Sequence, residues 1–235
     1  MPALRPSIPV AAALLAAVLA LPAVAPAETV AQFVQRRCAE CHGRTGVSKE
    51  HDDPKLAGQK PAYLRAQLRA FRSGARKSDE MQEVAADLSD AQIAVLADYF
   101  AAQTPQPDPP ADPALARAGA QVFNARGRGV PPCAACHRDS GTGWRGGPGY
   151  GGAMGRGPGM GHGLGMMGGG MMGGTMAMSD PALTPRLNGQ HAAYLEATLD
   201  DFAKGIRPSP DMQHAAAVLT PPERKAVAAY LSGLR

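Results

Sequence analysis

All four cysteines of the chain fall in two copies of one motif, CAECH at 38–42 and CAACH at 133–137. Two thiols three residues apart can add to the two vinyl groups of one porphyrin, and the adjacent histidine is then placed under the iron. The sequence therefore predicts two covalently attached haem c groups. The predicted attachment residues are Cys38, Cys41, Cys133 and Cys136, and the predicted proximal iron ligands are His42 and His137.

Three other chemistries use paired cysteines. A four-cysteine zinc site could combine the two CxxC pairs, but it would leave His42 and His137 unexplained. Structural disulfides would suit an exported chain with an even number of cysteines. A thioredoxin-like dithiol would need an alternation of strands and helices that the sequence lacks. Haem attachment is favoured because it gives both histidines a role, and the other three chemistries remain alternatives.

Two methionines are candidates for the second axial ligand of each iron. His42 precedes Met81 by 39 residues, whereas His137 precedes Met212 by 75. The difference of 36 residues is also the difference between the two distances, 12 and 48 residues, from each histidine to a PxLxGQ segment that both halves share. A methionine in a core is ordinarily a gap filler. Because these two stand at equivalent positions, we predict that they are axial ligands.

The shared segment belongs to a longer internal repeat. PKLAGQ at 54–59 recurs as PRLNGQ at 185–190, an offset of 131 residues, and the alignment continues without a gap for nearly fifty residues. Self-similarity of this kind indicates two related structural units. The further matching pairs are Tyr63 and Tyr194, Phe71 and Phe202, Arg76 and Arg207, Met81 and Met212, Leu88 and Leu219, and Tyr99 and Tyr230.

Helix signals occur at the same places in both halves. SDAQ at 89–92 and TPPE at 220–223 are capping boxes, and each precedes apolar residues spaced by three and four. A second helical pair is expected at 62–71 and 192–202, each followed closely by a glycine suited to a C-terminal cap. Alanine, glycine and proline are abundant while β-branched residues are few, which favours helices over sheets. The predicted fold class is all-α.

The domain organisation follows from these signals. Residues 1–27 resemble a cleaved secretory signal, with an early arginine, an apolar run and small residues near the end, although an uncleaved anchor is the alternative. A first domain at 28–103 and a second at 114–235 are expected on either side of a proline-rich linker, 104–113, which spans ~31 Å as polyproline. A glycine- and methionine-rich insertion occupies 140–178 in the second domain.

The order CxxCH, PxLxG and a lone methionine before a C-terminal helix resembles class I cytochrome c. Two such units in tandem, with GQ completing the PxL motif, resemble the dihaem cytochrome c4 family over residues 29–103 and 113–234. In that family each domain wraps around one haem, and the resemblance places Phe33 and Phe123 on helices that cross the C-terminal helices.

The resemblance also assigns residues around each haem. The carbonyl groups of Pro54 and Pro185 are expected to accept a hydrogen bond from the proximal histidine, which would fix its tautomer and orientation. Arg76 and Arg207 are expected to pair with haem propionates, with an exposed loop arginine as the alternative. His/Met ligation leaves no open coordination position on the iron.

The predicted function is outer-sphere electron transfer without catalysis. A periplasmic carrier would take electrons from a quinol-oxidising complex and pass them to a terminal oxidase or reductase. The alternatives are the cytochrome subunit of a flavocytochrome-type dehydrogenase and, less favoured, a dihaem peroxidase. The formal charge of +4 is too small and scattered to suggest a nucleic acid partner. The mature chain is expected to have no membrane span, and peripheral association with a membrane is left open.

Two features of the sequence are not explained by the predicted function. The insertion 140–178 is rich in thioether sulfur, which could bind Cu(I), and the alternative is a disordered glycine-rich loop. His51, His191 and His214 have no counterparts in the opposite half. We therefore expect them to be surface residues.

Overall fold

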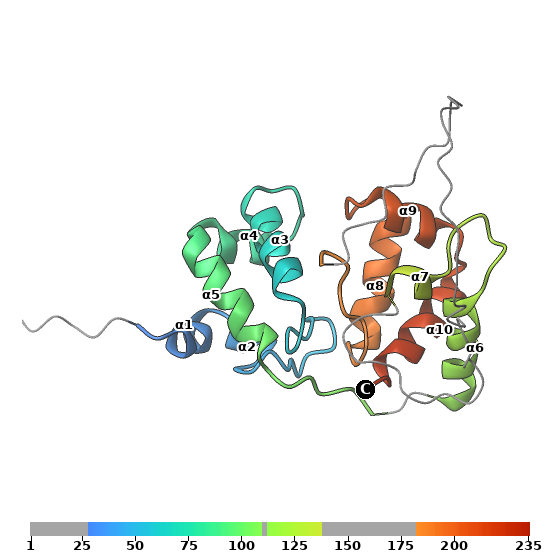
Figure 1. Ribbon diagram of the computed structural model, residues 1–235, viewed down its shortest axis with the longest axis horizontal. Coiled ribbons are helices and arrows are strands. Elements are labelled where there is room, and N and C mark those ends of the chain that lie inside the picture. The colour runs from blue at the N-terminus through green and yellow to red at the C-terminus, as the bar shows by residue number, and fades with distance from the viewer. Residues whose placement is uncertain (1–27, 110–111, 138–181) are drawn as a thin grey trace, which may run out of the picture.

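The computed structural model describes residues 28–109, 112–137 and 182–235, and within these ranges every regular element is a helix. The helices form two groups joined by the linker, α1 to α5 and α6 to α10 (Figure 1). The predicted all-α class is confirmed. The helices are α1 Val30–Arg37, α2 Ala39–His42, α3 Pro61–Arg72, α4 Asp79–Ala86, α5 Asp90–Ala101, α6 Pro113–Asn124, α7 Cys133–His137, α8 Ala192–Ala203, α9 Pro210–Ala217 and α10 Pro221–Ser232.

The predicted helix ends are found in the structure. Ser89 caps α5 reciprocally, since Gln92 N–H donates to the serine hydroxyl at 3.2 Å and Ser89 N–H donates to Gln92 Oε1 at 2.9 Å. Glu223 makes the equivalent contact with Thr220 N–H at 2.8 Å at the start of α10. Gly205 follows α8 with a φ of 71°, a value that L side chains rarely adopt.

Each helix group has its own core. In the first domain, α3 and α1 both pack on α5. In the second, α6 and α8 pack on α10. The buried residues include Val34, Leu64, Phe71, Ile93 and Phe100 in the first domain, and Phe123, Leu195, Val227 and Leu231 in the second.

The crossing of α6 over α10 is close because a glycine lies at the contact. A Cβ atom on Gly119 would stand 1.9 Å from the carbonyl oxygen of Ala226. Phe123, one turn later on α6, is buried with its ring 5.7 Å from that of Tyr230. In the first domain the corresponding aromatic, Phe33, is half-buried on α1. The structure thus places both predicted aromatics on the N-terminal helices of their domains.

Two predictions fall outside the described residues. The signal segment 1–27 and the copper-binding insertion 140–178 both lie there, so each remains a prediction. Among the helices of the described ranges, none is long and apolar enough to cross a membrane.

Candidate functional site

The last four residues of the first CxxCH motif form the short helix α2. Cys38 is the N-cap of α2 and His42 is its last residue. His42 is buried, and its Nδ1 lies 2.9 Å from the carbonyl oxygen of Pro54. Burial lowers the pKa of His42, although the Pro54 contact opposes this shift. A neutral imidazole whose Nδ1–H donates to this carbonyl would leave Nε2 free, which is the form that binds a metal.

The second motif has the same arrangement. Cys133 and His137 are the first and last residues of α7. His137 Nδ1 lies 3.3 Å from the carbonyl oxygen of Pro185, a longer contact than the one in the first domain. Burial again lowers the pKa of the histidine. Both predicted proline carbonyls thus face the ring nitrogen that would not bind iron.

Each predicted methionine ligand occupies the third position of a capped helix. Met81 N–H donates to the hydroxyl of Ser78 at 3.3 Å, and Met212 N–H donates to that of Ser209 at 3.4 Å. Both serines are N-caps, of α4 and α9 respectively. Because an N-cap fixes where a helix begins, the same local sequence places both thioethers equivalently.

One cavity of about 840 Å³ joins these groups. It is continuous across both domains, near the upper end of the roughly 300–1,000 Å³ typical of cofactor sites. The lining residues with predicted roles are Cys38, Cys41, His42, Pro54, Arg76, Met81, Cys133, His137, Pro185, Arg207 and Met212.

The residues around this cavity fit a covalently bound haem in each domain. None of the four cysteines is paired in a disulfide, so each is available for thioether formation. Cys38 and Cys133 are partly buried, and desolvation raises the pKa of Cys38 to about 11. Cys41 and Cys136, the second cysteines of the two motifs, are exposed.

The predicted haem arginines make reciprocal contacts across the domain interface. Arg76 Nη2 donates to Tyr194 Oη at 3.2 Å, and Arg207 Nη2 donates to Tyr63 Oη at 2.7 Å. Both guanidinium groups also approach Gln67 Oε1, at 2.6 Å from Arg76 and 3.1 Å from Arg207. The two arginines are equivalent positions of the repeat, and so are the two tyrosines. The domains therefore meet about a pseudo-twofold axis. Pairing of the arginines with propionates remains a prediction.

The two arginines also act on the tyrosines between the domains. Desolvation would raise the pKa of Tyr194, but the charges of Arg76 and Arg207 outweigh it and lower this pKa to about 8. For Tyr63, burial dominates and raises the pKa. One phenol beside the cavity therefore has an ionisation close to neutral pH.

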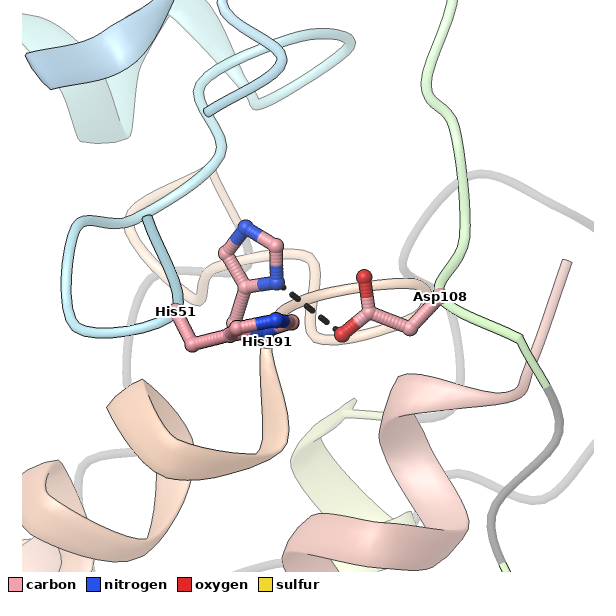
Figure 2. Close-up of side chains that lie close together, drawn as sticks. All are labelled: His51, Asp108 and His191. Carbon is pink, nitrogen blue, oxygen red and sulfur yellow. Dashed lines mark hydrogen bonds and ion pairs between the residues drawn. The ribbon is translucent and has the colours of Figure 1, made fainter. Parts of the chain in front are cut away.

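His191 is not a surface residue, contrary to the sequence prediction. It is only 2% exposed and lies at the interface with the first domain and the linker. Its Nδ1 lies 2.9 Å from Asp108 Oδ2 (Figure 2). Its Nε2 lies 3.2 Å from Ser48 O. The prediction failed because His191 pairs with a linker residue, and the linker occurs once in the chain. His51 and His214 are exposed as expected.

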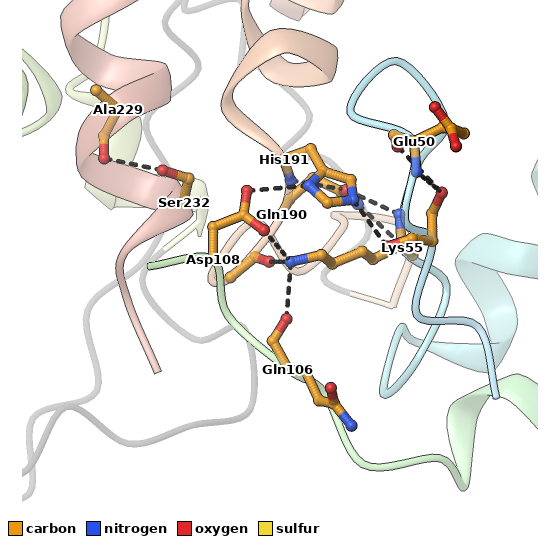
Figure 3. A network of polar contacts seen from close by, with 10 residues as sticks. Glu50, Lys55, Gln106, Asp108, Gln190, His191, Ala229 and Ser232 are labelled. Carbon is orange, nitrogen blue, oxygen red and sulfur yellow. Dashed lines mark hydrogen bonds and ion pairs between the residues drawn. The ribbon is translucent and has the colours of Figure 1, made fainter. Parts of the chain in front are cut away.

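A buried lysine completes this polar network. Lys55 Nζ contacts Asp108 Oδ1 at 2.6 Å and donates to the carbonyl of Gln106 at 2.8 Å (Figure 3). Desolvation would raise the pKa of Asp108, but hydrogen bonds from Lys55 and His191 outweigh it and lower that pKa. The cluster joins both domains to the linker.

The same cluster contains the residue types of a metal site. His51, Asp108 and His191 place ligand atoms within 4.8 Å of one another. However, Lys55 already neutralises the carboxylate, and both ring nitrogens of His191 face protein oxygens. We therefore interpret the cluster as an ion-paired interface.

Comparison with known proteins identifies the family. The chain is 34% identical over 202 residues to a cytochrome c4 of Thiocapsa roseopersicina, in an alignment that covers 84% of this chain and 86% of that protein. The chain belongs to the cytochrome c4 family. Residues 25–100 match the family described as cytochrome c oxidase, cbb3-type, subunit III, and residues 116–235 match the family described as cytochrome c.

The chain is also similar to a cytochrome c4 of known structure and to a protein that is named as an electron acceptor. The crystal structure of reduced recombinant cytochrome c4 from Pseudomonas stutzeri has a TM-score of 0.67 and 30% identity, covering 88% of this chain and 97% of that one. A thiosulfate dehydrogenase electron acceptor of Stutzerimonas stutzeri strain A1501 is 34% identical over 206 residues, covering 84% of this chain and 78% of that protein. As a member of the cytochrome c4 family, the chain is a dihaem electron-transfer protein with two haem c groups at its CxxCH motifs.

Proposed function

We propose that this cytochrome is a periplasmic carrier that exchanges single electrons with redox partners through two haems of His/Met ligation. The proposed axial pairs are His42 with Met81 and His137 with Met212. The observation that carries this proposal is the equivalence of the two sites. In each, a histidine facing a proline carbonyl and a methionine at the third position of a serine-capped helix line one continuous cavity.

The chain's own residues suit outer-sphere transfer. A haem iron held this way supplies reversible one-electron chemistry at a raised reduction potential. The thiols of each motif anchor the group, and the proline carbonyl fixes the histidine tautomer and orientation. The methionine would fill the remaining axial position, which would leave no place for a substrate to bind. This argues against the peroxidase alternative.

We infer only the classes of protein that donate electrons to this cytochrome and accept electrons from it. The apolar N-terminal segment supports export to the periplasm, where a quinol-oxidising complex would supply electrons and a terminal oxidase or reductase would consume them. A dehydrogenase is a second candidate donor, favoured by the relative named as a thiosulfate dehydrogenase electron acceptor.

Rapid mixing of the purified holoprotein tests the carrier role and separates the donors. If a quinol-oxidising complex is the donor, the protein is reduced by membranes that oxidise quinol and is reoxidised by membranes that contain a terminal oxidase. Rapid reduction by a purified thiosulfate dehydrogenase, with slow reduction by the membranes, would favour the second donor. Turnover of hydrogen peroxide by the protein alone would contradict the carrier role.

A further inference from the structure

Each PxLxGQ segment ends in a glutamine whose side chain crosses to the other domain. Lys55 N–H, in the first domain, donates to Gln190 Oε1 at 2.8 Å, and Gln190 Nε2 donates back to Lys55 O at 2.9 Å (Figure 3). The first-domain glutamine repeats this pairing. Arg186 N–H donates to Gln59 Oε1 at 2.8 Å, and Gln59 Nε2 donates to Arg186 O at 2.9 Å.

Both glutamines are held firmly in these positions. Gln59 is 7% exposed and Gln190 is 8% exposed, so neither side chain can exchange its partners readily for water. Each Oε1 also accepts from the N–H of the next residue at 3.0 Å, Lys60 in one domain and His191 in the other. Buried amides with several partners of this kind are rigid and costly to disturb.

The peptide group that each glutamine contacts also faces a proximal histidine. Pro54 C=O and Lys55 N–H belong to one peptide group, and His42 Nδ1 lies 2.9 Å from Pro54 O. A hydrogen-bonded chain therefore runs from the histidine of the first domain, through this peptide, to Gln190 of the second.

The second domain has the mirrored arrangement. His137 Nδ1 lies 3.3 Å from Pro185 O, and the N–H of the same peptide group is that of Arg186, which donates to Gln59 of the first domain. We propose that Gln190 and Gln59 are positioning residues that tune the haem of the opposite domain through this shared peptide. The inference rests on the proposed roles of His42 and His137 as iron ligands.

The expected direction follows from hydrogen-bond cooperativity. A glutamine that accepts from the peptide N–H polarises the peptide and makes its carbonyl a stronger acceptor. The histidine Nδ1–H then donates more strongly, which increases the basicity of the ligand. A more basic ligand favours the oxidised iron, so each glutamine lowers the reduction potential of the haem across the interface. The shorter contact at His42 predicts a larger effect of Gln190 than of Gln59.

A reciprocal pair of neutral variants tests this proposal on the full holoprotein. Gln190→Met should raise the potential of the first-domain haem and move the second-domain haem less, with an upfield NMR shift of the His42 Nδ1 proton in the reduced protein. Gln59→Met should do the reverse, and each variant is the matched control for the other. Larger shifts in the glutamine's own domain, equal shifts in both domains, or none would overturn the proposal.

A second pair, Gln190→Glu and Gln59→Glu, decides the question if the methionine variants fail to fold. A carboxylate still accepts from the peptide N–H and does so more strongly, so the opposite haem should fall in potential by more than the haem of the same domain. A larger fall in the same domain would overturn the proposal. If the protein without substitutions does not show the spectrum of His/Met ligation, the proposed function itself is refuted.

Discussion

At the scale of single residues, each candidate methionine ligand is placed by a serine three positions earlier. The N-cap contacts at Ser78 and Ser209 are alike in length, so the two sites should respond alike to substitution. Methionine raises the potential of a haem relative to histidine at the same position. Met81→His should therefore lower the potential of one haem and leave the other nearly unchanged, with Met212→His giving the converse in a redox titration. Two silent variants would show that the ligands are wrongly assigned.

Tyr194 provides a prediction of pH dependence. Its pKa of about 8 means that a phenolate forms beside the cavity as the pH rises. A new negative charge favours the oxidised iron, so at least one haem potential should fall between about pH 7 and pH 9. Tyr194→Phe should remove this fall. Tyr230→Phe is the control, because burial raises the pKa of Tyr230. A slope unchanged in Tyr194→Phe would contradict the assignment.

Functional residues that occur in both halves of the repeat can be predicted from the sequence. Residues that occur only once cannot be predicted in this way. The histidine and methionine pairs stand at matching distances once the insertion is subtracted, so their equivalence is visible without a structure. His191 faces Asp108 of the linker, which has no second copy, and no spacing rule could identify that contact. Gln59 and Gln190 were visible as part of the motif, but repetition alone does not distinguish a core residue from an interface residue.

At the scale of helices, the crossing of α6 and α10 depends on Gly119. A Cβ atom there would overlap the carbonyl of Ala226, so the helices would have to separate. Gly119→Ala should lower the free energy of unfolding by about 1–3 kcal/mol, the usual cost of overpacking a core. Chemical denaturation of the holoprotein measures this change. Ala118→Ser, at an exposed neighbouring position, should have little effect, and an equal loss in both variants would contradict the packing account.

Helix ends were easier to predict than helix contacts. The capping boxes at Ser89 and Thr220 depend only on residues three positions apart, and both were found as expected. The close approach at Gly119 depends on a helix about a hundred residues later in the chain. A glycine within a helical pattern was the only local signal, and it is ambiguous without knowledge of the partner helix.

At the scale of the whole molecule, the buried network of Lys55, Asp108 and His191 joins the domains and the linker. The side chains of Lys55 and Asp108 are 8% and 15% exposed. Removing one partner of such a pair leaves the other charge buried, so Asp108→Ala should cost about 3–5 kcal/mol of stability. Asp98→Ala breaks an exposed ion pair with Arg65 and should cost less than about 1 kcal/mol.

Thermal unfolding of the two holoprotein variants makes this comparison. Similar losses in both variants would mean that the network contributes little to the interface. The two-domain organisation was evident from the repeat, but the contact between domains was not, because a proline-rich linker limits only the distance between them. The reciprocal pairs at the interface settle this arrangement through contacts between residues far apart in the chain.

A redox titration of the purified holoprotein, followed by its visible spectrum, tests the central claim of two His/Met-ligated haems most directly. We expect two one-electron steps and low-spin, six-coordinate spectra with an axial methionine in both domains. Uptake of a single electron per chain, a five-coordinate haem or a bis-histidine spectrum in either domain would contradict it.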